Sequence, residues 1–169
     1  MSIKNLAIIA IALMLSLQSY SQAMKEYSGN GLTISYPDTW ENMAYPNTVF
    51  LLIRPLEEQG QKFRENVNLI ISDSKGLTLD EYAALTKLQF PRQLKDFEII
   101  ATNSKTIDGK PCKEIIYTHN YGDLEIEAAY YLFIIKGKSY EFTCSTLRSS
   151  YNTYYSLFSE MMNNLKFDN

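Results

Sequence analysis

Apolar residues occupy every second position in several segments of the first half of the chain, a pattern typical of strands with one buried face. The strands predicted from this alternation, together with one continuous apolar run, cover residues 32–36, 49–53 and 66–72. The turn dipeptide Asn30-Gly31 introduces the first of them. The polar segment 56–64, which separates the second and third, predicts a mobile loop.

A period of three to four residues predicts two helices. The first covers residues 78–90. It begins with a capping box formed by Thr78 and Glu81 and ends before Pro91, because proline lacks the backbone donor. The apolar side of this helix is predicted to contain Leu79, Tyr82, Ala83, Leu85 and Phe90. The second helix is an apolar stripe from Tyr151 to Leu165, introduced by Ser149 or Ser150 as N-cap, which predicts packing on a sheet.

Between the helices, alternation predicts a strand at 97–102, a turn at Asp108-Gly109 and then a three-stranded meander with turns at 120–123 and 136–138. Pairing apolar residues across the turns places Tyr117 opposite Ile126, and a three-residue loop at 136–138 places Cys144 opposite Tyr130. The middle strand starts with one polar face and ends apolar on both faces. We therefore expect its end to be covered on both sides.

The two cysteines, Cys112 and Cys144, are predicted to be free thiols. In the register above, Cys112 lies opposite Tyr131 and faces the other side of the sheet, with a whole strand between it and Cys144. Two strand spacings are about 9.6 Å, whereas bridged cysteines need Cα atoms within about 7 Å. A one-residue slip would change the faces but would leave the intervening strand in place.

Together these elements predict an α+β fold, a twisted and mainly antiparallel sheet flanked by helices. Residues 1–23 are predicted to be a signal peptide, because Lys4 precedes the apolar run 6–17 and small residues allow cleavage after Ser21 or Ala23. As a helix the apolar run spans about 18 Å, which is short of the ~30 Å hydrocarbon core. We expect an exported periplasmic or extracellular protein without a permanent membrane span, with one domain at 24–169.

Composition narrows the possible partners. The chain carries 16 basic and 19 acidic residues, and removing the leader takes away one lysine and makes the charge one unit more negative. An acidic domain without a basic stripe argues against nucleic-acid binding. Hydrophobic residues make up 46% of the chain, which excludes a disordered polypeptide.

The segment 31–41 (GLTISYPDTWE) resembles the entry strand of PsbP-like and DcrB-like proteins, in which an apolar strand leads into Tyr-Pro-x-x-Trp. The helix start 77–82, the turn 107–111 and the end of the terminal helix at 165–167 are similar to features of the same families. The resemblance covers most of residues 27–167 and implies an α/β/α sandwich around an antiparallel sheet. Members include extrinsic photosystem subunits, envelope lipoproteins and chaperones of hydrophobic helices. The resemblance therefore implies a fold but no single activity. The chain also lacks the lipidated cysteine of DcrB-like lipoproteins.

No catalytic set is recognisable from spacing. His119, the only histidine, is predicted to be an exposed residue beside a turn. Cys112 is seven strand residues away, about 23 Å, so the two do not form a nucleophile pair. One histidine and two separated cysteines do not supply a zinc site, and the glycines form no phosphate-binding loop. Asp73, Asp80 and Glu81 are the one candidate cation site, although the last two also suit a helix N-terminus.

The aromatic residues give the remaining candidates. Trp40 is predicted to fill one end of the core, and Tyr45, Tyr121, Tyr151 and Tyr155 are the candidate interaction surface. We expect a non-enzymatic exported module, without cofactor or metal, that binds a protein or a hydrophobic segment through a sheet face or groove. The alternative is an accessory domain of the cell envelope that binds a small ligand or a cation. A hydrolase is the third hypothesis.

Overall fold

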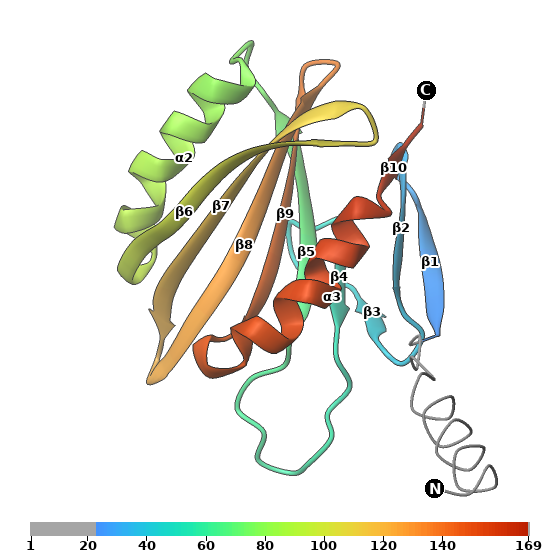
Figure 1. Ribbon diagram of the computed structural model, residues 1–169, viewed down its shortest axis with the longest axis vertical. Coiled ribbons are helices and arrows are strands. Elements are labelled where there is room, and N and C mark those ends of the chain that lie inside the picture. Colours follow the sequence, from blue (N-terminus) through green and yellow to red (C-terminus); the bar gives the residue numbers. More distant parts are fainter. Residues whose placement is uncertain (1–22, 169) are drawn as a thin grey trace, which may run out of the picture.

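The computed structural model describes residues 23–168, so the predicted signal peptide lies outside the described residues except for Ala23. The main feature is a seven-stranded antiparallel sheet with the strand order β3-β4-β5-β9-β8-β7-β6 (Figure 1). Its strands are β3 (Glu41–Met43), β4 (Phe50–Ile53), β5 (Asn66–Asp73), β6 (Lys95–Ile107), β7 (Lys110–Tyr121), β8 (Leu124–Ile135) and β9 (Lys138–Leu147). The predicted strands at 49–53 and 66–72 are therefore present, and the strand predicted at 97–102 is longer than expected.

A second, three-stranded sheet consists of β1 (Met24–Gly29), β2 (Leu32–Pro37) and β10 (Lys166–Phe167). The predicted turn at Asn30-Gly31 connects β1 and β2, and both turn residues have positive φ values, 56° and 82°. This is the geometry that matches the twist of a tight hairpin. The apolar side chains Leu32 and Ile34 of β2 are fully buried, as the alternation predicted.

Helix α2 (Leu79–Gln93) covers β6, β7 and β8 on one face of the large sheet (Figure 1). The capping box is present: Thr78 Oγ1 accepts from the Glu81 backbone, and Glu81 Oε2 accepts from the Thr78 backbone. The predicted end of this helix was wrong. Pro91 lies inside it and the helix continues to Gln93, because the residues after the proline keep helical bonds such as that from the Leu94 N–H to the Phe90 carbonyl. Leu85 is 39% exposed, although the wheel placed it on the buried side.

Helix α3 (Tyr151–Asn163) lies on the opposite face, between the two sheets (Figure 1). Its stripe buries Phe158, Met161 and Met162 in the larger of two hydrophobic clusters, as predicted for a helix packed on a sheet. Trp40 completes this cluster, with its ring centroid 6.5 Å from that of Phe158. Ser150 occupies the N-cap but makes no capping hydrogen bond, because a 3₁₀ turn (Arg148–Ser150) leads directly into the helix.

The meander forms as predicted, but both registers differ from the prediction. Tyr117 lies opposite Ala128, a shift of two residues that keeps the side chains on the predicted faces. Cys144 lies opposite Ala129, a shift of one residue that changes the face. The second difference arises because Lys136-Gly137 is a two-residue turn with φ values of 50° and 78°, rather than a three-residue loop.

The two cysteines therefore face the same side of the sheet, in the cluster beneath α3, and not opposite sides as predicted. They are nevertheless free thiols, since β8 separates their strands. The end of β8 is covered on both sides, by α2 on one face and by the α3 cluster on the other, as its sequence indicated.

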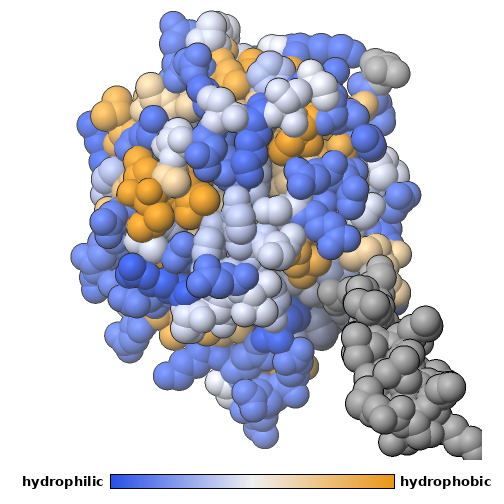
Figure 2. Space-filling model, viewed as in Figure 1, coloured by the Kyte–Doolittle hydropathy of each residue, from blue (hydrophilic) through white to orange (hydrophobic). Residues whose placement is uncertain are grey.

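The architecture is the predicted α+β fold, with a mainly antiparallel sheet between helices. On the face shown in Figure 2, hydrophobic residues form separate patches among hydrophilic residues. Within residues 23–168, none of the helices has the length and apolar character needed to cross a membrane.

Candidate binding groove

Helix α2 covers only half of its face of the large sheet, and a groove lies on the uncovered strands β4 and β5. Since side chains alternate along a strand, Phe50, Leu52, Val67 and Leu69 point into the core and their neighbours point outward. The outward residues that form the floor of the groove are Leu51, Ile53, Asn66, Asn68 and Ile70. Three of these five residues are apolar, and Ile70 is 37% exposed.

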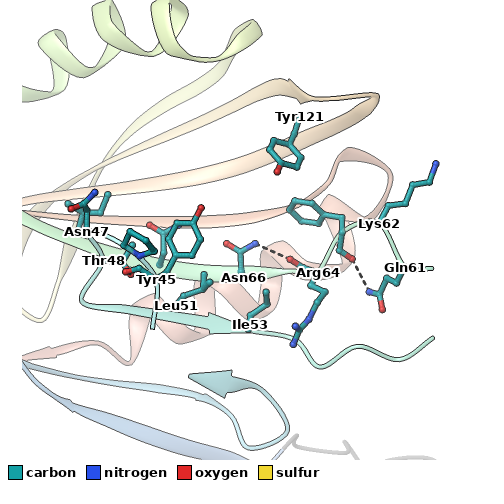
Figure 3. Close-up of a pocket in the computed structure, with 14 residues that line it drawn as sticks. Tyr45, Asn47, Thr48, Leu51, Ile53, Gln61, Lys62, Arg64, Asn66 and Tyr121 are labelled. Carbon is teal, nitrogen blue, oxygen red and sulfur yellow. Dashed lines mark hydrogen bonds between the residues drawn. The ribbon is translucent and has the colours of Figure 1, made fainter. Parts of the chain in front are cut away.

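Two loops and one hairpin enclose this floor (Figure 3). The loop 45–48 stands at the Ile70 end, and the loop 61–64 stands at the end near Ile53. Tyr121, at the tip of the β7–β8 hairpin, overhangs the second end. The groove has a volume of about 690 Å³, which is within the range of 300–1,000 Å³ that is common for ligand sites.

Ion pairs fix the base of the loop 54–65. Arg54 Nε contacts Glu65 Oε2 at 2.6 Å, and Glu65 is 3% exposed. Arg64 Nη2 reaches Glu41 Oε2 at 2.8 Å, and its Nε donates to the Arg54 carbonyl. Asn66 Nδ2 donates to the Arg64 carbonyl at 2.9 Å. Because these contacts hold both ends of the loop, residues 61–64 have a defined position beside the floor.

The structure divides the four predicted tyrosines into two pairs. Tyr45 and Tyr121 both line the groove and are 61% and 67% exposed. Tyr151 and Tyr155 belong to α3, where their rings stack with centroids 5.3 Å apart. Tyr151 is only 8% exposed, because it packs against the sheet beneath the helix. The four side chains therefore do not form one surface.

A buried carboxylate holds α3 on the sheet. Glu114 is fully buried, and its carboxylate accepts from Lys105 Nζ at 2.7 Å, from Asn103 Nδ2 at 2.8 Å and from the Tyr155 hydroxyl at 3.0 Å. Burial raises the pKa of this carboxyl, but the bonds from Lys105 and Asn103 outweigh burial and hold the pKa below its usual value. The cluster is structural, because its acceptor sites already have donors from the protein.

A second carboxylate anchors α2 next to the groove. Glu141 on β9 accepts from the hydroxyls of Tyr82, Tyr130 and Ser139 at 2.7–2.8 Å. Glu141 pairs in register with Ile70, so this anchor lies one strand from the groove floor. No pattern in the sequence indicates this cluster, because its members are separated by up to 59 residues.

His119 is not the exposed turn residue that the sequence predicted. It lies within β7 opposite Ile126, it is half-buried, and its ring centroid is 5.9 Å from that of Tyr117. Burial lowers its pKa, and its Nδ1 has no hydrogen-bond partner. Among the described residues no carboxylate bonds to the ring, so an acid–base pair is not formed there.

The predicted cation ligands have other partners. Asp73 accepts from the Lys75 backbone, Glu81 forms the capping box, and Asp80 pairs with Lys113 Nζ at 2.6 Å. Within residues 23–168, no three His, Cys, Asp or Glu side chains are grouped so that they could hold a metal ion.

Sequence reasoning missed the groove floor, but a signal was present. Residues 49–53 and 69–71 are continuous apolar runs, which are typical of strands covered on both faces. The alternation Val67, Leu69 and Ile71 accounts for one face only. It leaves Ile70 without an explanation, and the structure places Ile70 on the uncovered face.

Comparison with known proteins agrees with this architecture. The model of the PsbP family matches residues 22–167. No curated protein matches the sequence.

Three solved structures resemble the chain at low sequence identity. The cyanobacterial PsbP protein CyanoP from Synechocystis sp. PCC 6803 is 21% identical, with a TM-score of 0.65 over 89% of this chain and 95% of that one. LpqN, involved in cell envelope biogenesis of Mycobacterium tuberculosis, is 10% identical, with a TM-score of 0.65 over 87% and 91%. PA94 from Pseudomonas aeruginosa, a protein of unknown function, is 15% identical, with a TM-score of 0.60 over 83% and 94%. These similarities establish the fold and leave the activity to the site itself.

Proposed function

The chain belongs to the PsbP family, and from that premise we propose that it is an exported, non-enzymatic domain that binds a polypeptide segment of another protein in the groove on β4 and β5. The sequence of residues 1–23 supports export. The groove supports binding. The fold of the family serves as a scaffold for both features and does not specify the partner.

The observation that carries the proposal is that β4 and β5 have the apolar pattern of strands buried on both faces, although no helix within residues 23–168 covers one of these faces. Strands β4 and β5 are apolar on both faces over 49–53 and 69–71, as in strands that are buried on both sides. Yet α2 packs over β6–β8 and reaches β9 through the Tyr82 side chain, and Leu51, Ile53 and Ile70 remain partly exposed. Covering these side chains removes apolar area from water, which favours association.

The surroundings of the nucleophilic side chains support a role without catalysis. Burial raises the pKa of the Cys112 thiol to about 12 and also raises that of Cys144. A reactive cysteine requires the opposite shift and an exposed position. His119 has no carboxylate to orient it, which a histidine base normally has.

A small apolar ligand in the same groove is the second candidate, and the volume of about 690 Å³ favours it. The cation version of this alternative has less support, because Asp73, Asp80 and Glu81 have other partners.

Site-specific photocrosslinking tests the proposal. A photoreactive amino acid is placed at Leu51 in the groove or, as a control, at Ile100 on the distant strand β6. Both positions are partly exposed residues within strands. We expect a discrete protein adduct in envelope extract from the Leu51 position only. Equal labelling from both positions, or none from Leu51, would contradict the proposal.

A thermal shift measurement distinguishes the second candidate. The domain is mixed with the low-molecular-mass fraction and with the macromolecular fraction of the same extract. A ligand at about 100 times its Kd stabilises the folded state by about 2.7 kcal/mol. If only the small-molecule fraction stabilises the domain, the groove binds a small ligand and the polypeptide hypothesis is wrong.

A further inference from the structure

The charges around the groove are opposite in sign to the net charge of the chain. Fourteen residues line the groove (Figure 3), and the only charged ones among them are Lys62 and Arg64. The chain as a whole has 19 acidic and 16 basic residues. A surface without carboxylates on an acidic protein is a local site that attracts negative charge.

Lys62 and Arg64 differ in whether they can pair with a carboxylate of a ligand. Arg64 is occupied, because its guanidinium pairs with Glu41 at 2.8 Å and also donates to the Arg54 carbonyl. Lys62 is exposed and takes part in none of the ion pairs of residues 23–168. Its side chain extends from the loop at the same end of the groove as Tyr121 (Figure 3).

The carboxylates of this loop do not line the groove. Glu57 and Glu58 line the adjoining pocket between the loop and α3, which shares Gln61, Lys62 and Phe63 with the groove. Arg54 pairs with Glu57 at 2.6 Å as well as with the buried Glu65 at 2.6 Å. In the groove, the exposed tyrosines 45 and 121 add hydroxyl groups, which donate to carboxylate oxygens as readily as to water. The site therefore combines an apolar floor with one free cation and phenol donors at its rim.

We infer that the segment bound in the groove is acidic: apolar side chains cover Leu51, Ile53 and Ile70, and one or more carboxylates lie at the Lys62 end. This inference rests on the proposed function and specifies its partner. The chain as a whole has more carboxylates than cations, so its net charge disfavours binding of an acidic segment elsewhere. Charge thereby gives specificity for the groove as well as attraction to it.

Two synthetic peptides provide the test. Each has six residues of alternating valine and serine, followed by either three glutamates or three glutamines. At low salt we expect the glutamate peptide to bind about two- to fivefold tighter, with a preference that declines as salt rises, because exposed ion pairs are modest and screened. Fluorescence anisotropy measures both affinities.

Matched variants assign the preference to residues. Lys62→Glu should abolish the preference for glutamate, whereas Lys138→Glu, an equal charge change on the exposed residue after the β8–β9 turn, should retain it. Ile70→Ser should weaken both peptides by the same factor, about fivefold. Ile100→Ser, the same change at a strand position outside the groove, should leave both affinities unchanged.

The outcomes distinguish two hypotheses: that the bound segment is acidic, and that the groove binds a polypeptide at all. Equal binding of the two peptides, or a glutamate preference that survives Lys62→Glu, overturns the inference while the groove stands as a peptide site. Binding of neither peptide, or binding that is indifferent to Ile70→Ser, overturns the groove as the site of the proposed function.

Discussion

At the scale of single residues, burial is the main cause of the lowered pKa of His119, and it outweighs a backbone hydrogen bond at Asn120 that acts in the opposite direction. Its ring lies against Tyr117 within β7, no carboxylate bonds to it, and burial lowers its pKa from the ordinary value of about 6.5. The folded protein therefore binds this proton less readily than the unfolded chain. Its contribution to stability is complete above about pH 6.5 and is lost as the pH falls below that value.

The first prediction follows from the fact that the chain has a single histidine. The free energy of unfolding should decrease from pH 7 to pH 5.5, and His119→Gln should remove most of this slope, because glutamine does not titrate. Urea unfolding of both proteins at four pH values measures the pH dependence of the free energy of unfolding. Carboxylates titrate mainly below this window, so an unchanged slope in the variant would contradict the assignment.

Residue identity alone did not place the site residues correctly in every case. Tyr45 and Tyr121 are two of the four tyrosines that the sequence suggested as an interaction surface, and the structure brings both to the groove. Tyr151 could not be distinguished from them, although it is buried. Whether a tyrosine is exposed depends on which elements lie over it, and single residues carry no information about that.

At the scale of elements, local contacts determine where α2 begins. Thr78 and Glu81 satisfy one another's backbone groups three residues apart, and this reciprocal pair can be recognised in the sequence. The end of α2 is different. Pro91 removes one backbone donor in the last turn, but packing of Phe90 against Phe97 and Tyr117 holds the helix on the sheet.

The second prediction concerns this cap. Thr78→Ala should destabilise the protein by about 1 kcal/mol, because one N-terminal amide of α2 loses its acceptor. Thr78→Ser, which keeps a hydroxyl, should stay within about 0.5 kcal/mol of the parent. Chemical denaturation measures both. A loss of equal size in the two variants would show that the methyl group and not the hydroxyl matters.

Strand registers show the limit of prediction for elements. The apolar pattern of β7, β8 and β9 identified three strands and their order, but it permits several alignments of apolar with apolar residues. The conformation of Lys136-Gly137 selects one of them. Since one residue more or less in a turn reverses every side chain of the strand, this detail moved Cys144 to the other face.

At the scale of the whole molecule, two layers of packing decide which groups meet solvent. The cluster beneath α3 encloses both cysteines, while the other face of the sheet is covered only over β6–β8. The same arrangement therefore produces inert thiols on one side and an open groove on the other.

The third prediction tests this burial. A thiol reagent should label no cysteine in the native protein and two per chain in denaturant, because Cys112 and Cys144 are free, buried and of raised pKa. A reducing agent should leave the midpoint of thermal unfolding unchanged. Labelling of fewer than two thiols in denaturant without reductant would reveal a disulfide and would contradict the observed pairing of the strands.

The sequence by itself determined seven of the ten strands, the two helices, the cap at Thr78, the turn at Asn30-Gly31 and the α+β class, because each depends on contacts between near neighbours or on a repeated period. It did not indicate β1, β3 or β10. Only the tertiary structure decided which faces are covered. The floor at Leu51, Asn68 and Ile70 is open because α2 extends over just part of the sheet. Lys62 and Tyr121, about 60 residues apart in the sequence, both line this groove. Such long-range proximity results from the competition among all possible packings, and no local pattern encodes it.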